Sequence, residues 1–452
     1  MIRRRFDISR FTSSEEGGIT ALSLYMFLAT LVVGGLAVDY ASGVAAKTEL
    51  QVAADAAAHA ALYTRELNTA DTAKAKAIQI AAATLPPGKY GTVLTPEDIV
   101  FGSWDGTKFI PDAGSDRAVA VTTRRLKSGG NGVATYMLGL VGINAWDVVS
   151  TSVFETYMSD CEDEGIISRL RLEMQSNGWF TNGICLHSQD YVKVSSNNIY
   201  DPGVIVSMPD KRRLELPSSG FDSNVGLKEA LRDSSYQIRI LNRIDTIIKS
   251  VNAPNDPVVG IMTSRTPQTE YYRSYITSPT QITIKANGPT ALDPTKFKTG
   301  RIHYMDCKND NTHKQIGLGF NLVKMVIITD CRLQLASGAV LQDAVIITTN
   351  TDAKSIYASS DIDIGKNDHC VSGGDVQIVT KGGVEFAAKA SIFGSQILAA
   401  GDVSLTAKAD GFEGVSIVAG GKADVTSNGR FGFCDGQGMA NSYAARYFRL
   451  VY

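Results

Sequence analysis

A long uncharged stretch near the N-terminus determines the first expected element. From Gly17 to Val38, between Glu16 and Asp39, the chain carries no charge and is rich in Leu, Val, Ala and Phe. As a helix this stretch reaches roughly 33 Å, enough for a hydrocarbon core of about 30 Å. A cleaved signal peptide usually has an apolar region of only about 7–15 residues, and no A-x-A site follows this one. The pattern therefore predicts a retained transmembrane helix over residues 17–38.

After the anchor, alanine and leucine continue to recur at helical spacing. They predict an Ala-rich helical stem over residues 39–88, which Pro86-Pro87-Gly88 ends. Small side chains on one face allow another backbone to come close, either the protein's own body or a partner helix. Asp39 and Asp55 are the candidates for contact with a partner helix, Asp39 through a basic residue on a neighbouring anchor. The alternatives are an interfacial cap for Asp39 and a solvated helix position for Asp55.

Short strands follow the stem. Four stretches have the alternation or the turn residues of strands: Ile99–Trp104, Lys108–Pro111, Ala118–Arg125 and Asp147–Tyr157. Asp105-Gly106 suits the positive φ of a tight hairpin turn between the first two. Val133–Val141 is expected to form one helix. Together these elements predict a small α+β module over residues 89–157.

The C-terminal part consists of short alternating runs with glycine at their corners. The phrase Gly373–Ile378 returns in similar form as Ala400–Leu405. Short strands repeating at roughly 20–27 residues are typical of a parallel β-solenoid. We therefore expect an all-β, right-handed parallel β-solenoid (β-helix) over residues 301–452, with a first solenoid-like segment over 158–200. A β-sandwich or jelly roll is the alternative, because its hairpins also use glycine-rich turns.

Proline marks an insert between the two solenoid segments. Nine of the thirteen prolines fall between Pro202 and Pro294, which indicates a loop-rich insert over residues 201–300. Within it, residues 227–251 have the apolar stripe of an amphipathic helix. We expect this helix to cover an end or edge of a sheet, with a partner-binding role as the alternative.

Charge indicates how the chain is oriented and which partners it lacks. The chain has 44 basic and 46 acidic residues, a net charge of −2, so no basic field favours nucleic acid. The first ten residues carry a charge of +3, from four arginines against Asp7. By the positive-inside rule, residues 1–16 form a cytoplasmic N-terminus and the remaining chain is exported.

All six cysteines lie well beyond the anchor. An even number of cysteines in an exported region predicts disulfides, and free buried thiols are the alternative. Two pairs of successive cysteines have the same spacing, which is close to one solenoid coil, but six cysteines permit 15 pairings and the sequence does not select one. The disulfide candidates are Cys161, Cys185, Cys307, Cys331, Cys370 and Cys434.

The sequence contains no strong signature of catalysis. It has no G-x-S-x-G, no phosphate loop ending in G-K-S/T, no H-E-x-x-H and no C-x-x-C motif, and its five histidines are never paired at i, i+4. We therefore assign no catalytic, cofactor-binding or metal-binding residue and do not expect an enzyme.

The anchor region carries a family resemblance. Three segments resemble the N-terminal region of TadG-type proteins of the tight-adherence (Tad, or Flp) pilus system: Glu15–Leu22, Gly35–Tyr40 and Leu50–Ala61. Further stretches, such as Tyr271–Ile276 and Leu341–Ile346, resemble the long alphaproteobacterial members. The chain lacks the D-x-S-x-S metal motif of many relatives, so metal-dependent adhesion is not implied. The resemblance implies a pilus-assembly protein with one anchor.

The function expected from these features is that of a non-enzymatic assembly or minor structural component of a Tad/Flp type IVc pilus. The resemblance implies contact with other Tad components, namely TadE/TadF-type minor pilins, the pilus platform or the pilin. It implies the inner membrane, with the bulk of the chain in the periplasm and the pilus tip as a second location. The alternatives are a membrane-tethered carbohydrate-binding or carbohydrate-cleaving β-helix protein and an adhesin.

Overall fold

The computed structural model describes residues 16–264, 269–286, 288, 291–308, 310, 312–358, 360–387, 390–405, 411–425 and 427–452. The chain forms two compact units. Unit 1 contains the residues up to Thr156 together with Phe448–Tyr452, and unit 2 is Tyr157–Tyr447. The predicted cytoplasmic segment 1–16 lies outside the described residues except for Glu16.

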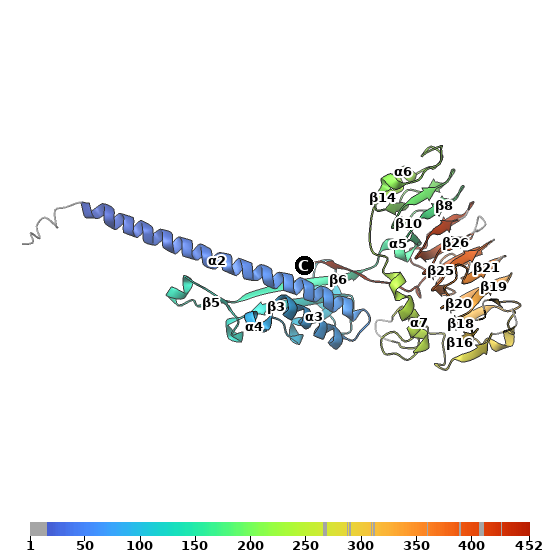
Figure 1. Ribbon diagram of the computed structural model, residues 1–452, viewed down its shortest axis with the longest axis horizontal. Coiled ribbons are helices and arrows are strands. Elements are labelled where there is room, and N and C mark those ends of the chain that lie inside the picture. The colour runs from blue at the N-terminus through green and yellow to red at the C-terminus, as the bar shows by residue number, and fades with distance from the viewer. Residues whose placement is uncertain are drawn as a thin grey trace, which may run out of the picture. The chain divides into compact units, whose positions relative to one another are not determined.

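Unit 1 combines one long helix with an antiparallel sheet (Figure 1). The sheet has the strand order β2-β1-β3-β6-β30, so the last strand of the chain completes it. A short hairpin, β4 paired with β5, is separate from that sheet. The elements of unit 1 are α2 (Glu16–Arg65), α3 (Ala70–Thr84), α4 (Pro87–Tyr90), η1 (Pro96–Asp98), β1 (Ile99–Trp104), β2 (Phe109–Pro111), β3 (Ala118–Arg125), η2 (Lys127–Gly129), β4 (Val133–Ala134), η3 (Leu138–Val141), β5 (Ala145–Trp146), β6 (Val148–Tyr157) and β30 (Tyr447–Leu450).

The helix α2 has two different halves. Residues 18–34 are all exposed, although they include large apolar side chains. Among the described residues, α2 is the one helix long and apolar enough to cross a membrane, as the sequence predicts for residues 17–38. From Gly35 onward a buried stripe appears, and the alanines and leucines of the stem pack in the core of unit 1. The stem therefore covers its own module.

The predicted strands of unit 1 are confirmed almost residue by residue. Trp104 pairs with Phe109 across Asp105-Gly106, and Gly106 has a φ of +97°. The expected helix over Val133–Val141 is wrong: this stretch forms β4, a loop and the 3₁₀ turn η3. Gly142, at a φ of +89°, ends the 3₁₀ turn and lets the chain return to pair Val133 with Trp146.

Unit 2 is a parallel β-solenoid, and the sandwich alternative is excluded because every described strand pair in it is parallel. Within the described residues, 15 strands form its larger sheet: β7 (Gly165–Ser168), β9 (Trp179–Phe180), β10 (Cys185–Ser188), β12 (Ile199–Tyr200), β13 (Ile205–Met208), β14 (Leu231–Asp233), β15 (Ile282–Lys285), β16 (Ile302–Asp306), β18 (Leu322–Thr329), β20 (Ala339–Thr348), β22 (Ile362–Ile364), β23 (Val376–Thr380), β25 (Ala390–Ala399), β27 (Phe412–Ala419) and β29 (Arg430–Gly432).

A second sheet of eight described strands runs beside the larger one. Its members are β8 (Leu172–Met174), β11 (Val192–Val194), β17 (His313–Ile316), β19 (Arg332–Leu335), β21 (Ile356–Ala358), β24 (Val384–Phe386), β26 (Val403–Leu405) and β28 (Ala423–Val425). Helical segments border the strands: α5 (Asp160–Asp163), η4 (Lys211–Arg213), α6 (Leu227–Ala230), η5 (Ile240–Arg243), α7 (Ile244–Asn252) and η6 (Pro294–Lys296).

The chain enters the solenoid in its middle. The first strand, β7, pairs with β10 on one side and with the late strand β27 on the other. From β7 the coils stack outward to β14, and the insert then carries the chain to the opposite end at β15. From β15 the coils return to β27. The two predicted solenoid segments thus form one continuous stack, which Figure 1 shows as successive arrows in unit 2.

The coil spacing differs from the repeat that the two similar glycine phrases indicate. Ile378 pairs with Ile397, and Ile397 pairs with Ile417, so one coil here takes about 20 residues. The two phrases lie on different sheets, since Val376 belongs to β23 and Val403 to β26. The shift between the two phrases is therefore longer than one coil, because it also includes the residues that lead from the larger sheet to the second sheet. Stacked equivalent positions form a buried aliphatic ladder of Ile327, Ile346, Ile378, Ile397, Ile417, Ile166, Leu186 and Val206.

Aromatic rings cross the junction between the last coil and the first. Phe431 stacks on Phe412 with centroids 4.7 Å apart and on Phe180 with centroids 4.9 Å apart. Phe180 in turn stacks on Tyr200 at 5.1 Å. These rings are buried, and such pairs contribute about 0.5–1.5 kcal/mol beyond the area they bury. The stack ties coils together that are distant in sequence.

The insert differs from its prediction. Residues 227–251 form α6, the strand β14, η5 and part of α7 instead of one helix. Asp233, Ser234 and Ser235 compete for backbone hydrogen bonds and disfavour a helix interior, and Leu231 pairs with Val206 to add a coil. Strands β13 and β15 also lie inside the expected insert range 201–300, so the non-solenoid segment runs from residue 234 to residue 281. At the other end of the predicted range 301–452, β30 belongs to the sheet of unit 1.

Candidate functional site

A stripe on α2 receives the hairpin of residues 133–146, called here the tip hairpin. Gly35, Asp39 and Gly43 are spaced at i, i+4 and i+8 and share one face of the helix. A Cβ atom at Gly35 would overlap the side chain of Met137, and one at Gly43 would overlap the ring of Trp146. Glycine at these two positions therefore lets the hairpin lie directly against the helix.

Asp39 fastens the tip hairpin to the helix. Its carboxylate accepts the backbone N–H groups of Tyr136 (2.6 Å), Met137 (2.9 Å) and Leu138 (2.7 Å). The side chain is only 1% exposed. Burial raises the pKa of the Asp39 carboxyl, but the three donors outweigh burial and hold the pKa below its usual value. The carboxylate thus supplies acceptors that this loop cannot provide for itself.

The two candidate aspartates therefore have different surroundings. Asp39 uses its oxygens within unit 1, as acceptors for the N–H groups of the tip hairpin. Asp55 is half-buried and accepts a hydrogen bond from Gln51 Nε2 at 2.8 Å, one turn away on the same helix. The contact of either residue with a partner helix stays a prediction.

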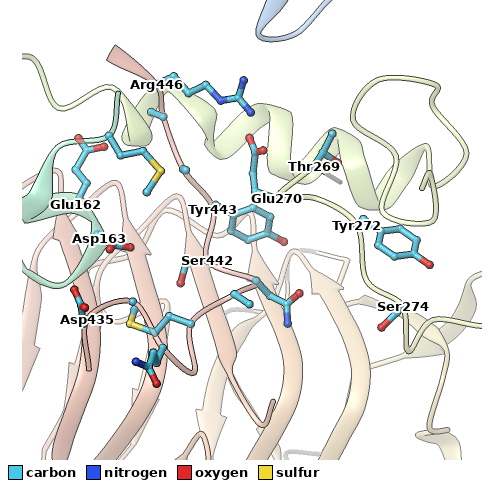
Figure 2. Close-up of a pocket in the computed structure, with 18 residues that line it drawn as sticks. Glu162, Asp163, Thr269, Glu270, Tyr272, Ser274, Asp435, Ser442, Tyr443 and Arg446 are labelled. Atoms are coloured by element: carbon cyan, nitrogen blue, oxygen red, sulfur yellow. The ribbon is translucent and has the colours of Figure 1, made fainter. Parts of the chain in front are cut away.

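A polar cleft lies on the flank of the solenoid in unit 2. It has a volume of about 520 Å³. Figure 2 shows that α5, the insert and the C-terminal segment after Cys434 supply its walls. We call it the flank cleft; its charged lining residues are Glu162, Asp163, Glu270, Asp435 and Arg446.

A row of polar side chains on the larger sheet holds these walls in place. Gln377, Gln396 and Ser416 are register neighbours on successive coils. Gln396 exchanges two hydrogen bonds of 2.8 Å with the backbone of Tyr443, and Ser416 Oγ donates to the Glu162 carbonyl at 2.8 Å. All three are buried because the covering segments lie on them.

Arg273 connects the insert to the same row. Its guanidinium is buried at 1% exposure, donates to Gln377 Oε1 (3.1 Å) and to the Asn441 carbonyl (2.7 Å), and lies over the Tyr443 ring at 4.8 Å. Asp375 accepts two hydrogen bonds from Asn441, at 2.8 and 3.0 Å. Burial raises the pKa of Asp375, against the lowering effect of Asn441 and Arg273. This network fixes the insert to the flank.

Two acidic groups beside the flank cleft are hydrogen-bonded within the protein: Glu162, which lines the cleft, and the buried Glu164. Glu164 accepts the N–H groups of Cys434 (2.8 Å) and Gly436 (2.7 Å). Burial, helped by repulsion from Asp163 and Asp435, raises the pKa of Glu164 to about 7 despite these two donors. Glu162 accepts a hydrogen bond from the Tyr447 hydroxyl. The cleft combines an acidic surface with aromatic and amide groups, an arrangement able to bind hydroxyl-rich or cationic ligands.

The six cysteines form three disulfides, all in unit 2: Cys161–Cys185, Cys307–Cys331 and Cys370–Cys434. The first two pairs share a sequence separation of 24. Cys307–Cys331 joins neighbouring coils, since these residues follow the paired strands β16 and β18, whereas Cys161–Cys185 joins the helix α5 to β10. Asp330 lies beside Cys331, and Glu413 beside Cys370, but the sulfur atoms are oxidised, so neither group offers thiolate ligands for a metal.

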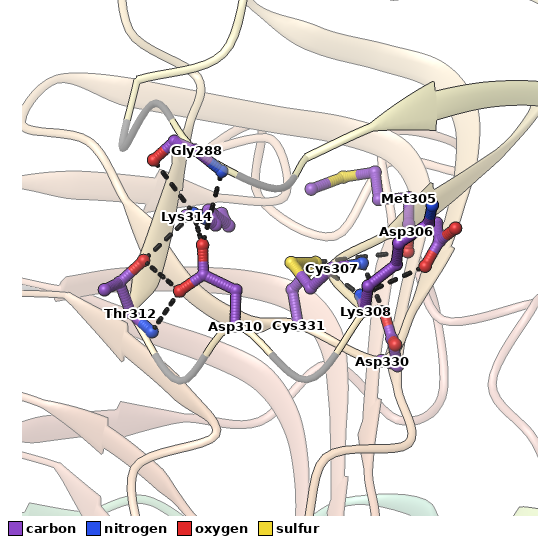
Figure 3. Close-up of polar contacts among 10 residues, drawn as sticks. All are labelled: Gly288, Met305, Asp306, Cys307, Lys308, Asp310, Thr312, Lys314, Asp330 and Cys331. Carbon is purple, nitrogen blue, oxygen red and sulfur yellow. Dashed lines mark hydrogen bonds and ion pairs between the residues drawn. A yellow bond between two sulfur atoms is a disulfide. The ribbon is translucent and has the colours of Figure 1, made fainter.

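An ion pair with a buried lysine lies near the second disulfide, at the end of the solenoid formed by β15 and β17 (Figure 3). Lys314 is fully buried and its ammonium contacts Asp310 at 2.6 Å and Thr312 Oγ1 at 2.9 Å. The side-chain hydrogen bond from Lys314 holds the pKa of Asp310 well below its usual value. On the far side of the disulfide, Asp330 accepts the N–H of Cys307 at 2.9 Å. These contacts hold the loop at this end of the solenoid.

Sequence reasoning missed the tip hairpin and the flank cleft. A pattern in the sequence could have indicated the cleft: Gln377, Gln396 and Ser416 each stand directly before an isoleucine of the ladder, and they are about one coil apart. The hairpin left one as well, because residues 128–146 contain no charge.

Two family models match the chain. Residues 165–435, more than half of the chain, match a family described as Domain of unknown function (DUF7867). The chain belongs to this family. The DUF7867 region begins at the first residue of β7 and ends just beyond Cys434, so it contains the solenoid strands and the insert. It includes five of the six disulfide-bonded cysteines; Cys161 lies just before it.

Residues 17–76 match the model described as Flp pilus-assembly TadE/G-like. This Tad-like segment comprises nearly all of α2 and the first half of α3, and it associates the chain with Flp/Tad pilus assembly. Neither the comparison with curated proteins nor that with solved structures gives a match.

Proposed function

We propose that this protein is a non-enzymatic, membrane-anchored assembly or minor structural component of a Tad/Flp type IVc pilus, of the long TadG-like kind. Its bare helix half lies in the inner membrane with the N-terminus in the cytoplasm. Unit 2 works in the periplasm, or at the pilus tip. Its partners are the TadE/TadF-type minor pilins, the pilus platform or the pilin.

One observation carries the proposal: the Tad-like match coincides with a helix whose first half is bare and apolar and whose second half is packed in its own module. A helix that only stabilised unit 1 would not need residues 18–34. Those residues suit a bilayer or the apolar helices of other pilus proteins. The three disulfides support an oxidising location for unit 2.

Site-specific photo-crosslinking in cells tests the proposed partners. A photoreactive residue at Phe27, 59% exposed on the bare half, should form adducts with Tad components that mass spectrometry identifies. Val52, similarly exposed at 54% on the stem, is the matched control. Adducts with unrelated membrane proteins only, or equal yields of the same adducts from both sites, would contradict recognition through the bare half.

The aspartates offer a second test of helix contacts. A chain with both Asp39→Ala and Asp55→Ala should reduce the number of surface pili if either residue contacts a partner helix. The single Asp55→Ala variant separates this from loss of the tip hairpin, because Asp39 supplies the hydrogen bonds that hold the hairpin and Asp55 accepts from Gln51 on its own helix. Unchanged pilus output from the double variant means that the helix-partner hypothesis is wrong.

The flank cleft favours one alternative, a glycan-binding or glycan-cleaving solenoid. Carboxylates beside tyrosine and amide groups suit sugar hydroxyls, and hydrolysis needs paired carboxylates. The purified full chain in detergent, tested on a polysaccharide panel, distinguishes the two functions. Release of reducing ends that Glu162→Gln or Asp163→Asn abolishes would replace the assembly proposal with an enzyme; the adhesin alternative predicts normal pili and lost attachment.

A further inference from the structure

The tip hairpin exposes apolar side chains beside the end of the proposed membrane span. Leu140 is 79% exposed, Val141 73% and Tyr136 69%. No charged residue occurs from Ser128 to Trp146. A clustered apolar surface of this kind on a folded module indicates contact with another apolar phase.

The hairpin lies along α2 in the direction of the bare half. At its base Trp146 packs on Gly43, and two helical turns nearer the N-terminus Met137 packs on Gly35. Two turns of helix rise about 11 Å. Figure 1 shows the hairpin with β5 projecting beside α2 toward the N-terminal end of that helix. Because Gly35 belongs to the uncharged stretch 17–38, the tip reaches about one helical turn into it.

The backbone of the hairpin is largely satisfied without water. Asp39 accepts the N–H groups of residues 136 to 138, and the N–H groups of 135, 140, 142 and 143 find carbonyls within the loop at 3.0–3.2 Å. Unpaired backbone groups are what exclude most loops from apolar surroundings. This loop therefore enters a poorly hydrated layer at low cost, although without a closed ladder it suits the interface and not the bilayer core.

Three aromatic residues lie within about one helical turn of Asp39 in the structure. Tyr40 follows it on the helix and is exposed, Tyr136 donates its N–H to it, and Trp146 packs one turn below at Gly43. Tyrosine and tryptophan concentrate at membrane interfaces, where the ring is apolar and the polar group stays wet. These residues place the interface at the base of the hairpin.

We propose that the tip hairpin is a second membrane contact, an interfacial wedge that inserts Leu140 and Val141 among the lipid headgroups and first acyl carbons beside α2. The ligand is the lipid bilayer itself. The expected depth of one helical turn fits the roughly 5–10 Å that interfacial elements reach. Two contacts, the span and the wedge, hold unit 1 in a fixed orientation on the membrane. The inference rests on the proposed membrane anchor.

Depth-dependent quenching tests the wedge on the full chain in liposomes of phosphatidylethanolamine and phosphatidylglycerol. Single cysteines carrying an environment-sensitive dye replace Leu140, Leu28 in the bare half, or Ile110 on β2, which is 43% exposed and serves as the matched control. A fourth site at Val141 guards against a local effect of the label. We expect lipid-attached nitroxide to quench dyes at 28, 140 and 141, with iodide quenching severalfold weaker there than at 110.

The outcomes separate the wedge from the anchor. If the dye at 28 is quenched by lipid nitroxide but dyes at 140 and 141 are quenched by iodide as at 110, the wedge is wrong and the anchor stands. If the dye at 28 is not quenched by lipid, the proposed anchor fails. If dyes at 140 and 141 are shielded from both quenchers, a protein surface covers the hairpin, which also overturns the wedge.

Discussion

The bare half of α2 and the interior of the solenoid use apolar side chains in opposite ways. Phe27 is 59% exposed on α2, whereas Phe431 is buried between two other rings in the solenoid. In the solenoid each apolar residue has an equivalent neighbour one coil above and one below, so burial repeats along the stack. On α2 no described segment covers residues 18–34. Apolar side chains thus stabilise unit 2 internally but stay available for external contacts on α2.

The largest expected effect is a difference in unfolding free energy between two Phe→Ala variants, one in the solenoid and one on the bare half of α2. Phe431→Ala removes a ring from the stack across the first and last coils and should cost about 3–5 kcal/mol of unfolding free energy. Phe27→Ala should change it by less than about 0.5 kcal/mol, because no packing is lost within the chain. Chemical denaturation of the chain in detergent, monitored by hydrogen-exchange mass spectrometry, reports the stability of each unit separately. A comparable loss from Phe27→Ala would mean that the bare half is packed.

Removal of a disulfide should change the stability of unit 2 but not that of unit 1. All three bonds lie in unit 2, and Cys370–Cys434 closes a separation of 64 residues, for which chain entropy gives about 4 kcal/mol. The paired variant Cys370→Ser with Cys434→Ser should lower the denaturation midpoint of unit 2 and leave unit 1 unchanged. A matched fall in unit 1 would indicate that the units unfold together.

A smaller, pH-dependent effect is expected at Glu164. Its folded-state pKa of about 7 lies above the unfolded value of 4.5, so the folded chain binds the proton more tightly. Protonated Glu164 therefore adds to the free energy of unfolding, on the order of 2 kcal/mol after allowance for solvent screening. This contribution is fully present below pH 4.5 and is lost as the pH rises through 7. The difference in stability between wild type and Glu164→Gln, measured from pH 4.5 to pH 8, isolates it from other groups. A difference that is flat with pH would refute the shift.

The smallest effect is local. Asp39→Ala removes the acceptor of three N–H groups, so amide exchange at residues 136–138 should accelerate about tenfold or more while the solenoid is unaffected. Asp55→Ala removes one acceptor from Gln51 and serves as the control. Equal protection of the hairpin in both variants would show that Asp39 does not hold it.

Local patterns predicted the elements that depend on neighbours in sequence. The uncharged stretch 17–38, the Asp105-Gly106 turn and strands such as Ala118–Arg125 all agree with the structure. The solenoid class followed from alternation and glycine corners. Its coil length did not, because Val376 and Val403 look alike in sequence but lie on different sheets.

Contacts between distant segments were beyond sequence patterns. Nothing local indicates that Ile166 pairs with Ile417, or that the chain enters the stack in its middle. The expected helix at Val133–Val141 failed because Asp39, far earlier in the chain, supplies the hydrogen bonds that make a loop stable there. The sequence did not select the cysteine pairing, because a bond such as Cys370–Cys434 depends on which distant segments the fold brings together.

The most direct test of the proposed function is a count of surface pili by electron microscopy. Cells that lack the gene are compared with the same cells complemented by the full chain, with membrane integrity checked in both. We predict loss of pili in the deletion and recovery on complementation. Normal pili in the deletion strain would contradict a role in pilus assembly and leave the solenoid as an adhesive or glycan-binding module.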